Sequence, residues 1–265
     1  MTNYYEDFNP TFGSRTDWSS PHVLRERARL HPDRVYLDVP WAGESFTYAE
    51  TLDLAERVGS GMLEAGAEPG DRVLVMLPNS SAYILAWLGS AVAGLAEVPI
   101  NSAYRGTFLA HQIATTSPSI AVVAPEFVER IVAVPDAITS IRHFFVTGDP
   151  ESVASGIAAL GAAGHQASPW DDLLTGSSRD LPEVAAHDLG SIFFTSGTTG
   201  LSKGVMMPHA HMYVFADVCV SLTRLTEDDV YMSVGPLFHG NSQFLAAYPA
   251  LIAGCHYVMH ERFSA

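Results

Sequence analysis

The stretch Asp188-Leu-Gly-Ser-Ile-Phe-Phe-Thr-Ser-Gly-Thr-Thr-Gly-Leu-Ser-Lys-Gly-Val205 is the segment from which fold and function are best predicted. Its apolar run Ile192–Phe194 is β-branched and aromatic, which favours a strand. The glycines and hydroxyl residues that follow can turn backbone N–H groups and side-chain donors inward around an anion. Lys203 then adds a compact positive charge that can follow a moving phosphate. The stretch therefore predicts a strand that ends in a phosphate-binding loop.

The lysine count supports this interpretation. The 14 basic residues of the chain are 13 arginines and one lysine, which is Lys203. A Gly/Ser/Thr tract is more often a surface linker, but a strand running directly into the tract argues against a linker here. The P-loop pattern Gly-x4-Gly-Lys-Ser/Thr also fails. Counting from Gly197 puts Ser202 at the second glycine and Gly204 where Ser or Thr should bind magnesium.

The segment Phe194–Gly200, followed by two residues and then Lys203-Gly-Val205, resembles the phosphate-loop signature of the adenylate-forming superfamily. This superfamily includes acyl-CoA synthetases, luciferases and peptide-synthetase adenylation domains. One position departs, because the family usually has proline before the lysine and this chain has Ser202. Weaker resemblances follow in the family's order at Phe46–Glu50, Gly70–Val73, Pro78–Ser80, Val98–Asn101 and Pro236–His239. Within the superfamily the chain is most similar to acyl-CoA synthetases of the fatty-acid and crotonobetaine/carnitine type.

Length and charge limit the classes of protein that fit. At 265 residues and 48% hydrophobic content, the chain can bury a substantial core. A net charge of −15 argues against nucleic acid or an anionic membrane surface as a partner. Cys219 and Cys255 make no disulfide framework, and the polar, acidic start is unlike a secretory signal, so we expect a cytoplasmic protein. The most apolar stretch, Tyr83–Ile100, contains Glu97, so we expect no membrane span.

Apolar periodicity predicts alternating helices and strands. The predicted strands are 72–77, a short one ending at 99, 119–123, 143–146, 192–194, 230–234 and 256–259. The predicted helices lie near 21–30, 47–66, 80–94, 107–115, 126–132, 152–160, 208–220 and 242–252, and a capping box at Thr47 and Glu50 begins the second. Residues 161–187 are expected to form a long loop. The predicted fold class is α/β, with parallel or mixed sheets flanked by helices.

Residues 1–20 mix aromatic, acidic and Ser/Pro character and predict a loosely held lead-in. By resemblance, residues 21–265 are an incomplete N-terminal adenylation domain. Its first lobe would span about 67–220, and 21–66 with 221–265 would begin a second, truncated lobe. The family's adenine, magnesium and ribose ligands and a small C-terminal domain with a second catalytic lysine would be absent. We therefore expect a fragment that is inactive alone, and an unpaired sheet edge that favours homo-oligomers.

The resemblance implies a two-step reaction that uses ATP, Mg²⁺ and CoA. A small-molecule carboxylate attacks the α-phosphate of Mg-ATP to give an acyl-adenylate and pyrophosphate, and the CoA thiol then displaces AMP to form a thioester. Because an anion meets a polyanion, charge neutralisation is the main task. The residues implied to cradle the β- and γ-phosphates are Thr195, Ser196, Gly197, Thr198, Thr199 and Gly200. Lys203 would neutralise the departing pyrophosphate and is the first predicted catalytic residue.

His239 is the second predicted catalytic residue. By resemblance, a histidine after Pro236-Leu-Phe238 would border both the acyl carboxylate and the α-phosphate. From the residues alone, a histidine packed at a strand end is the alternative. Phe244, Leu245 and Tyr248 are predicted to line the acyl pocket, although apolar residues at helical spacing are more often core. No histidine pair has a third ligand at a suitable spacing, so we predict no metal ligand in this chain.

Other functions fit the same residues. A non-catalytic nucleotide- or acyl-binding module would keep the loop without completing the reaction, and so would a subunit whose partner supplies the missing half. A P-loop NTPase is less favoured because of the failed Walker spacing. Thioester formation by the isolated chain would contradict the fragment interpretation.

Overall fold

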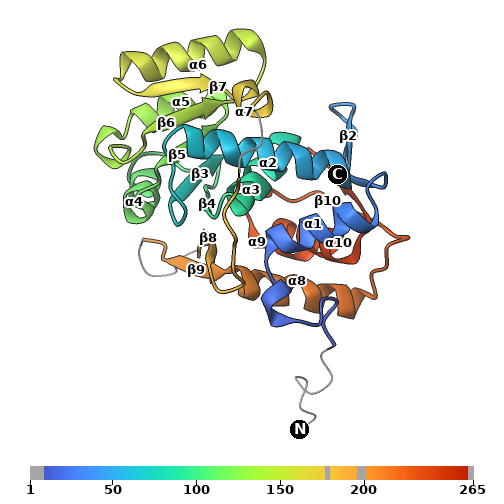
Figure 1. Cartoon of the computed structure of the whole chain (residues 1–265). Helices are drawn as coiled ribbons and strands as arrows, with labels where there is room; N and C mark the ends of the chain where they lie inside the picture. Colours follow the sequence, from blue (N-terminus) through green and yellow to red (C-terminus); the bar gives the residue numbers. More distant parts are fainter. Residues whose placement is uncertain (1–8, 177–179, 196–200, 262–265) are drawn as a thin grey trace.

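The computed structural model describes residues 9–176, 180–195 and 201–261, and their strands form two sheets (Figure 1). The larger sheet has the strand order β7-β6-β5-β3-β4-β8-β9. Its strands are parallel except for β9, which runs antiparallel to β8. The bounds are β3 Arg72–Met76, β4 Ala96–Pro99, β5 Ile120–Val123, β6 His143–Val146, β7 Gln166–Pro169, β8 Leu189–Phe194 and β9 Gly204–Pro208.

The smaller sheet joins the two ends of the described chain. Its order is β10-β11-β1-β2, in which β11 is parallel to both neighbours and β2 is antiparallel to β1. The bounds are β1 Val35–Val39, β2 Glu44–Thr47, β10 Val230–Ser233 and β11 His256–Met259. Because Leu37 pairs with Tyr257, the N-terminal hairpin and the last βα unit depend on each other.

Helices pack on both sheets. Their bounds are α1 Ser20–Leu30, α2 Tyr48–Glu64, α3 Ser81–Val92, α4 Gly106–Thr116, α5 Pro125–Val132, α6 Pro150–Ala162, α7 Asp171–Leu174, α8 His209–Thr223, α9 Gly240–Ser242 and α10 Tyr248–Ala253. Two 3₁₀ turns, η1 (Arg15–Asp17) and η2 (Pro135–Ala137), and a π-helical turn, η3 (Gln243–Ala247), complete the set. Among the described residues, no helix has the length and apolar character needed to cross a membrane.

The helix pair α2 and α3 connects the two sheets, because α2 contacts β1 and β2 while α3 contacts β3 and β4. Helix α3 is buried on every side from Ala82 to Val92, as expected of a helix that is apolar all round. The two helices touch at glycines. A Cβ on Gly59 would lie 2.7 Å from the Gly89 oxygen, and a Cβ on Gly89 would lie 2.5 Å from Val58 Cγ1. Any larger side chain at either position would separate the helices.

The predicted α/β fold class is confirmed, and the predicted elements within it are largely confirmed too. The capping box is present, since the Thr47 N–H donates to Glu50 and the Glu50 N–H donates to Thr47 Oγ1. The long loop predicted for residues 161–187 is wrong in part, because it contains β7 and α7. The hairpin of β1 and β2 was not predicted, and the helix predicted at 242–252 includes the turn η3.

The predicted loose lead-in is also wrong for residues 11–18. The Thr11 hydroxyl donates to Asp217 of α8 at 2.6 Å, and the Phe12 N–H donates to the Tyr213 hydroxyl at 2.8 Å. The Trp18 ring stacks on Tyr213 with 5.2 Å between centroids. Residues 1–8 lie outside the described part of the chain. The start of the described chain is therefore held on α8 by polar and aromatic contacts.

One carboxyl group is buried in the core of the larger sheet. Glu97, in the middle of β4, is fully buried, and its Oε2 accepts a hydrogen bond from Gln243 Nε2 at 2.8 Å. Burial raises the pKa of Glu97 from 4.5 to about 8, and the hydrogen bond from Gln243 lowers it only in part. Glu97 is therefore mainly a neutral carboxylic acid at pH 7.

This raised pKa predicts a loss of stability as the pH rises. Between pH 4.5 and 8 the unfolded chain carries an ionised Glu97 while the folded chain keeps it protonated, so unfolding releases a proton. The free energy of unfolding should fall across that window by about 3–5 kcal/mol. The variant Glu97→Gln should remove this slope and be more stable than wild type at pH 8, as measured by urea unfolding at pH 5 to 8. Glu151→Gln, on an exposed residue of α6, is the control, and parallel curves for wild type and Glu97→Gln would contradict the prediction.

Candidate functional site

A cavity of about 520 Å³ lies among the segments that follow β4, β8 and β10. These segments leave the carboxyl ends of their strands, which is where ligands bind in open parallel sheets. The cavity has an aromatic wall and a polar wall. The aromatic residues are Phe193, Phe194, Phe215, Phe238 and Phe244, and the polar ones include Asn101, Tyr104, Gln112, Thr195 and His239.

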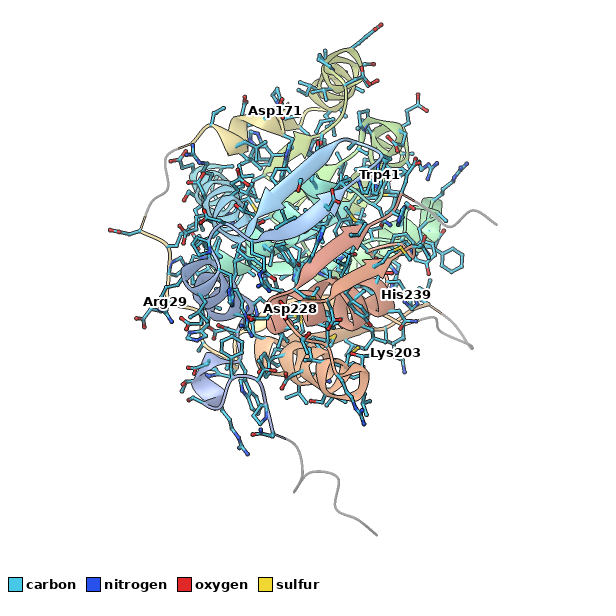
Figure 2. All side chains as sticks on the ribbon, turned by 90° about the vertical axis from the view of Figure 1, so that its right-hand side faces the viewer. Arg29, Trp41, Asp171, Lys203, Asp228 and His239 are labelled. Carbon is cyan, nitrogen blue, oxygen red and sulfur yellow. The ribbon has the colours of Figure 1, made fainter. Side chains whose placement is uncertain are left out.

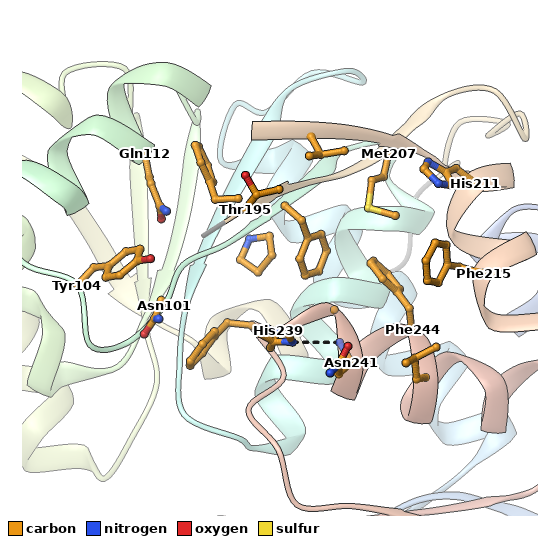
Figure 3. A pocket seen from close by; sticks show the side chains of 17 residues that line it. Asn101, Tyr104, Gln112, Thr195, Met207, His211, Phe215, His239, Asn241 and Phe244 are labelled. Carbon is orange, nitrogen blue, oxygen red and sulfur yellow. Dashed lines mark hydrogen bonds between the residues drawn. The ribbon is translucent and has the colours of Figure 1, made fainter. Parts of the chain in front are cut away.

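Polar side chains predominate on one side of the cavity and aromatic ones on the other, where His211 also lies beside Phe215 (Figure 3). Asn101, Tyr104 and Gln112 are on one side, and Phe215 and Phe244 are on the other, with Thr195 and His239 between them. Such a division suits a ligand with a polar head and an apolar tail.

The predicted phosphate loop connects β8 to β9 as a hairpin. At its base the Thr195 N–H donates to the Lys203 carbonyl at 3.1 Å, directly after the pair Phe194–Gly204. Ser196, Gly197, Thr198, Thr199 and Gly200 lie outside the described residues. The Lys203 side chain is exposed and lies on the same side of the molecule as His239 (Figure 2). Within the described part of the chain no carboxylate forms an ion pair with the Lys203 ammonium, so it is free to bind an anion.

Helix α4 holds the residue before Lys203. His111 Nε2 lies 2.8 Å from the Ser202 carbonyl, and Gln112 Nε2 donates to Ser202 Oγ at 3.2 Å. Because a carbonyl oxygen only accepts, Nε2 of His111 carries the hydrogen. Ser202 is buried, so these two hydrogen bonds set the direction in which the chain enters β9. The hydroxyl that distinguishes this chain from the family signature thus has a partner of its own.

His239 has a defined hydrogen-bonding state. Its Nδ1 accepts from the Asn241 N–H at 3.3 Å, which caps the short helix α9 (Figure 3). In the neutral ring the proton is therefore on Nε2. The side chain is exposed and lines the cavity, so Nε2–H can donate to an anionic oxygen inside it.

Asn79 holds the segment that carries His239. Its side-chain amide donates to the carbonyls of Gly235 at 2.9 Å and His260 at 3.0 Å, and its Oδ1 accepts from the Leu237 N–H at 2.8 Å. Asn79 follows β3 of the larger sheet, whereas its three partners follow β10 and β11 of the smaller one. One buried carboxamide therefore fixes the distance between the two sheets at the cavity.

The structure places most of the predicted site residues that it describes around one cavity. Thr195, His239, Phe244 and Leu245 line it, and Lys203 is at the base of the adjoining hairpin. Tyr248 does not line it, because it is fully buried with its ring edge-on to Trp87 at 5.6 Å. The helix α4 was predicted, but Phe193 of β8 and His111 and Gln112 of α4 were not predicted as site residues. The alternation along β8 could have identified Phe193, but no sequence signal connects α4 with the site.

The described residues offer no obvious metal centre. No group of three His, Cys, Asp or Glu residues within 9–176, 180–195 and 201–261 is placed to hold a metal ion. His209, at the start of α8, is buried beside Ser20, and burial lowers its pKa to about 4. We therefore assign no metal ligand to these residues.

Comparison with known proteins gives consistent matches. A model of the family described as "AMP-binding enzyme" matches residues 24–265. A crotonobetaine/carnitine–CoA ligase of Salmonella agona (strain SL483) is 30% identical over 224 residues, which is 83% of this chain and 41% of the relative. The apo structure of Mycobacterium smegmatis MbtA is 27% identical with a TM-score of 0.78, and the match covers 97% of this chain and 48% of that one.

A further match shows the fold alone. The inhibitor-bound N-terminal domain of FACL13 from Mycobacterium tuberculosis has a TM-score of 0.80 at 21% identity, with 93% of this chain and 58% of that chain covered. The chain thus spans 41% of the length of the curated relative and about half of the solved structures. The strands of both sheets and the residues that line the cavity lie within residues 24–265, which the family model matches.

The Asn79 contacts predict a large loss of stability on substitution. Asn79→Ala should lower the free energy of unfolding by about 2–4 kcal/mol, because it leaves buried backbone groups of the His239 segment without partners. Asn79→Asp keeps an acceptor for Leu237 but cannot donate to the two carbonyls, so it should be no better. Urea unfolding measures both, and Asn241→Ala, an exposed asparagine in the same segment, is the control. A loss below 0.5 kcal/mol in Asn79→Ala would show that the contact is unimportant.

Proposed function

The chain belongs to the AMP-binding enzyme family, and from that premise we propose that it supplies the phosphate loop and part of the acyl pocket of an acyl-CoA ligase. In this proposal, ATP activates a carboxylic acid to an acyl-adenylate, and CoA then takes the acyl group as a thioester. The observation that supports it is that Thr195, whose N–H donates to the Lys203 carbonyl at the base of the hairpin, lines a cavity with polar and aromatic side chains.

Lys203 is proposed to bind the pyrophosphate part of ATP. Its ammonium is exposed and lies directly after a residue that α4 holds by two hydrogen bonds. With a net charge of −15, the protein as a whole repels ATP, so binding has to come from local donors. The residues proposed to add such donors are Ser196, Gly197, Thr198, Thr199 and Gly200. Mg²⁺, when bound with ATP, would neutralise further phosphate charge.

His239 is proposed to bind the carboxylate or the α-phosphate. Its Nε2–H is directed by the Asn241 contact and can donate to an oxygen that carries negative charge. The hydrogen bond would hold the two reacting groups together, and His239 need not change its protonation state to make it.

The acyl group is proposed to be apolar and uncharged. Phe193, Phe215 and Phe244 line the side of the cavity away from Asn101, Tyr104 and Gln112. His211 also lies on that side, beside Phe215, but no Asp, Glu, Lys or Arg among the described residues lines the cavity. A volume of about 520 Å³ is within the usual range for small-ligand pockets. Octanoate is a suitable probe, because it combines a carboxylate with an apolar chain.

Lys203→Ala should weaken the binding of magnesium pyrophosphate and of Mg-ATP at least tenfold in isothermal titration calorimetry, because a direct phosphate contact is lost. The melting temperature should not change, since the side chain is exposed. Lys203→Arg should retain part of the affinity. Arg29→Ala, which removes the same unit charge at an exposed position distant from Lys203 in Figure 2, is the control for net charge. Equal affinities of wild type and Lys203→Ala would refute the assigned role.

His239→Asn should separate the two contacts of the ring. Asparagine can still accept from the Asn241 N–H and cap α9, but its shorter amide donor does not reach the position that Nε2–H occupies. We expect octanoate affinity to fall about tenfold, in line with the loss of one charge-assisted hydrogen bond, with little change in stability. His239→Ala should in addition lose about 1 kcal/mol of stability, because the cap is lost. Wild-type affinity for octanoate in His239→Asn would exclude His239 as a carboxylate ligand.

A further inference from the structure

Two buried polar residues, Glu97 and Ser191, lie next to the residues of β4 and β8 that line the cavity. Glu97 of β4 is opposite Ser191 of β8, and the Ser191 hydroxyl donates to the Glu97 carbonyl at 3.0 Å. Two residues further along the same strands, Pro99 and Phe193 line the cavity. Because side chains alternate along a strand, Glu97 and Pro99 point to one face of the sheet. Glu97 therefore lies on the same face of the sheet as Pro99, next to the cavity but not lining it.

The opposite wall comes from the π-helical turn η3. Phe244 and Leu245 of this turn line the cavity, and the Phe244 ring packs on Phe193 with 4.7 Å between centroids. The first residue of the turn is Gln243, whose amide donates to Glu97 at 2.8 Å. A single buried hydrogen bond thus joins the sheet to the turn, directly beneath the aromatic contact.

Burying Glu97 and Gln243 costs more free energy than filling the same space with apolar side chains. Glu97 and Gln243 are both fully buried, and Gln243 Oε1 makes no hydrogen bond to any residue that the structure describes. Two aliphatic side chains of similar size would avoid the cost of burying these polar groups. A hydrogen bond has a fixed direction, however, and aliphatic packing does not, so the bond can specify where the turn lies.

The outer side of the turn is held separately. The Leu245 carbonyl accepts from the Tyr231 hydroxyl at 3.0 Å, and the Cys219 thiol lies 3.6 Å from the same oxygen. A π-helical turn is wider than an α-helical one, and such turns occur frequently at functional sites. The inner contact through Gln243 and the outer contact through Tyr231 together set its position.

We propose that Glu97, acting through Gln243, is a positioning residue of the acyl cavity that holds η3 so that Phe244 closes against Phe193. The ligand that this cavity takes rests on the function proposed above. The position of the turn does not depend on that function, so the two can be tested apart.

The protonation of Glu97 links this contact to pH. Tyr83 of α3 is the titratable group that faces the carboxyl, and Gln243 of η3 and Ser191 of β8 are uncharged. No cation among the described residues offsets a negative charge at Glu97. Ionisation above pH 8 therefore favours water entry next to the cavity and displacement of the turn.

The first experiment measures octanoate binding by calorimetry. Gln243→Leu and Glu97→Leu should weaken octanoate at least fivefold, while Glu97→Gln, which can still accept from Gln243, should stay within twofold of wild type at pH 7. Magnesium pyrophosphate affinity should not change in any variant, because the hairpin base is not part of the contact. Glu151→Gln on α6 is the matched control for removing a carboxylate.

The second experiment needs no ligand. The chain has two cysteines, of which Cys219 is half-buried beside the Leu245 carbonyl and Cys255 is buried. Reaction of Cys219 with a disulfide reagent should be at least fivefold faster in Gln243→Leu and Glu97→Leu than in wild type. Cys255 should stay unreactive, which shows that the variant is folded.

The third measurement is a pH profile that a purely structural role would not produce. Wild-type octanoate affinity should fall several-fold between pH 7 and 9, and in Glu97→Gln it should be flat. The pH profile also tests whether Glu97 positions the turn if the leucine variants fail to fold, because Glu97→Gln keeps the hydrogen bond with Gln243.

The outcomes separate the two proposals. If wild type does not bind octanoate, the proposed acyl function fails, and the Cys219 rates alone decide whether Glu97 holds the turn. If folded leucine variants keep both the octanoate affinity and the Cys219 rate of wild type, the inference is overturned. It is also overturned if wild type and Glu97→Gln bind octanoate and share one pH profile.

Discussion

The carboxamide of Asn79 is the contact on which the rest of the site depends. The two sheets touch through apolar helices, and apolar packing tolerates small sliding movements. Asn79 removes that freedom, because its three hydrogen bonds reach only the segments after β10 and β11. With those segments fixed, His239 faces the hairpin base across one cavity. The cavity thus results from a relation between two sheets and belongs to neither alone.

A feature could be predicted from the sequence when it depends on residues that are close together in the chain, and could not when its partners are far apart. The strand before Thr195, the hairpin and the α/β alternation depend on neighbouring residues, and periodicity shows them. The cavity wall was predicted less well. Phe244 and Tyr248 are four residues apart and look alike in a helical pattern, but the π-helical turn between them changes which side each faces. Ser202 and its partners on α4 are some 90 residues apart in sequence, so no local pattern connects them.

The net negative charge of the protein explains why ATP binding has to depend on a few local donors such as Lys203. A net charge of −15 excludes a broad attractive field for ATP, so affinity has to come from short-range donors. Arginine is used elsewhere for fixed contacts, such as Arg72 with the Thr116 carbonyl or Arg27 with the Ile252 carbonyl. The exposed ammonium of Lys203 makes no such structural contact within the described chain, and a phosphate does not have to displace one to reach it.

The interior therefore contains two kinds of contact with different tasks. Apart from Glu97 and Ser191, the buried strand residues of the larger sheet are mainly apolar, and the free energy of apolar burial is insensitive to direction. At three places around the cavity a buried polar side chain joins two segments that are distant in sequence: Asn79 between the sheets, Gln112 at the hairpin and Gln243 at the turn. Each of these amides is more costly to bury than an aliphatic group, and each orients a segment that lines the cavity. If stability were the only requirement, aliphatic side chains would serve better at these three positions. The amides are explained by the need to hold the polar and apolar sides of the cavity in fixed positions relative to each other.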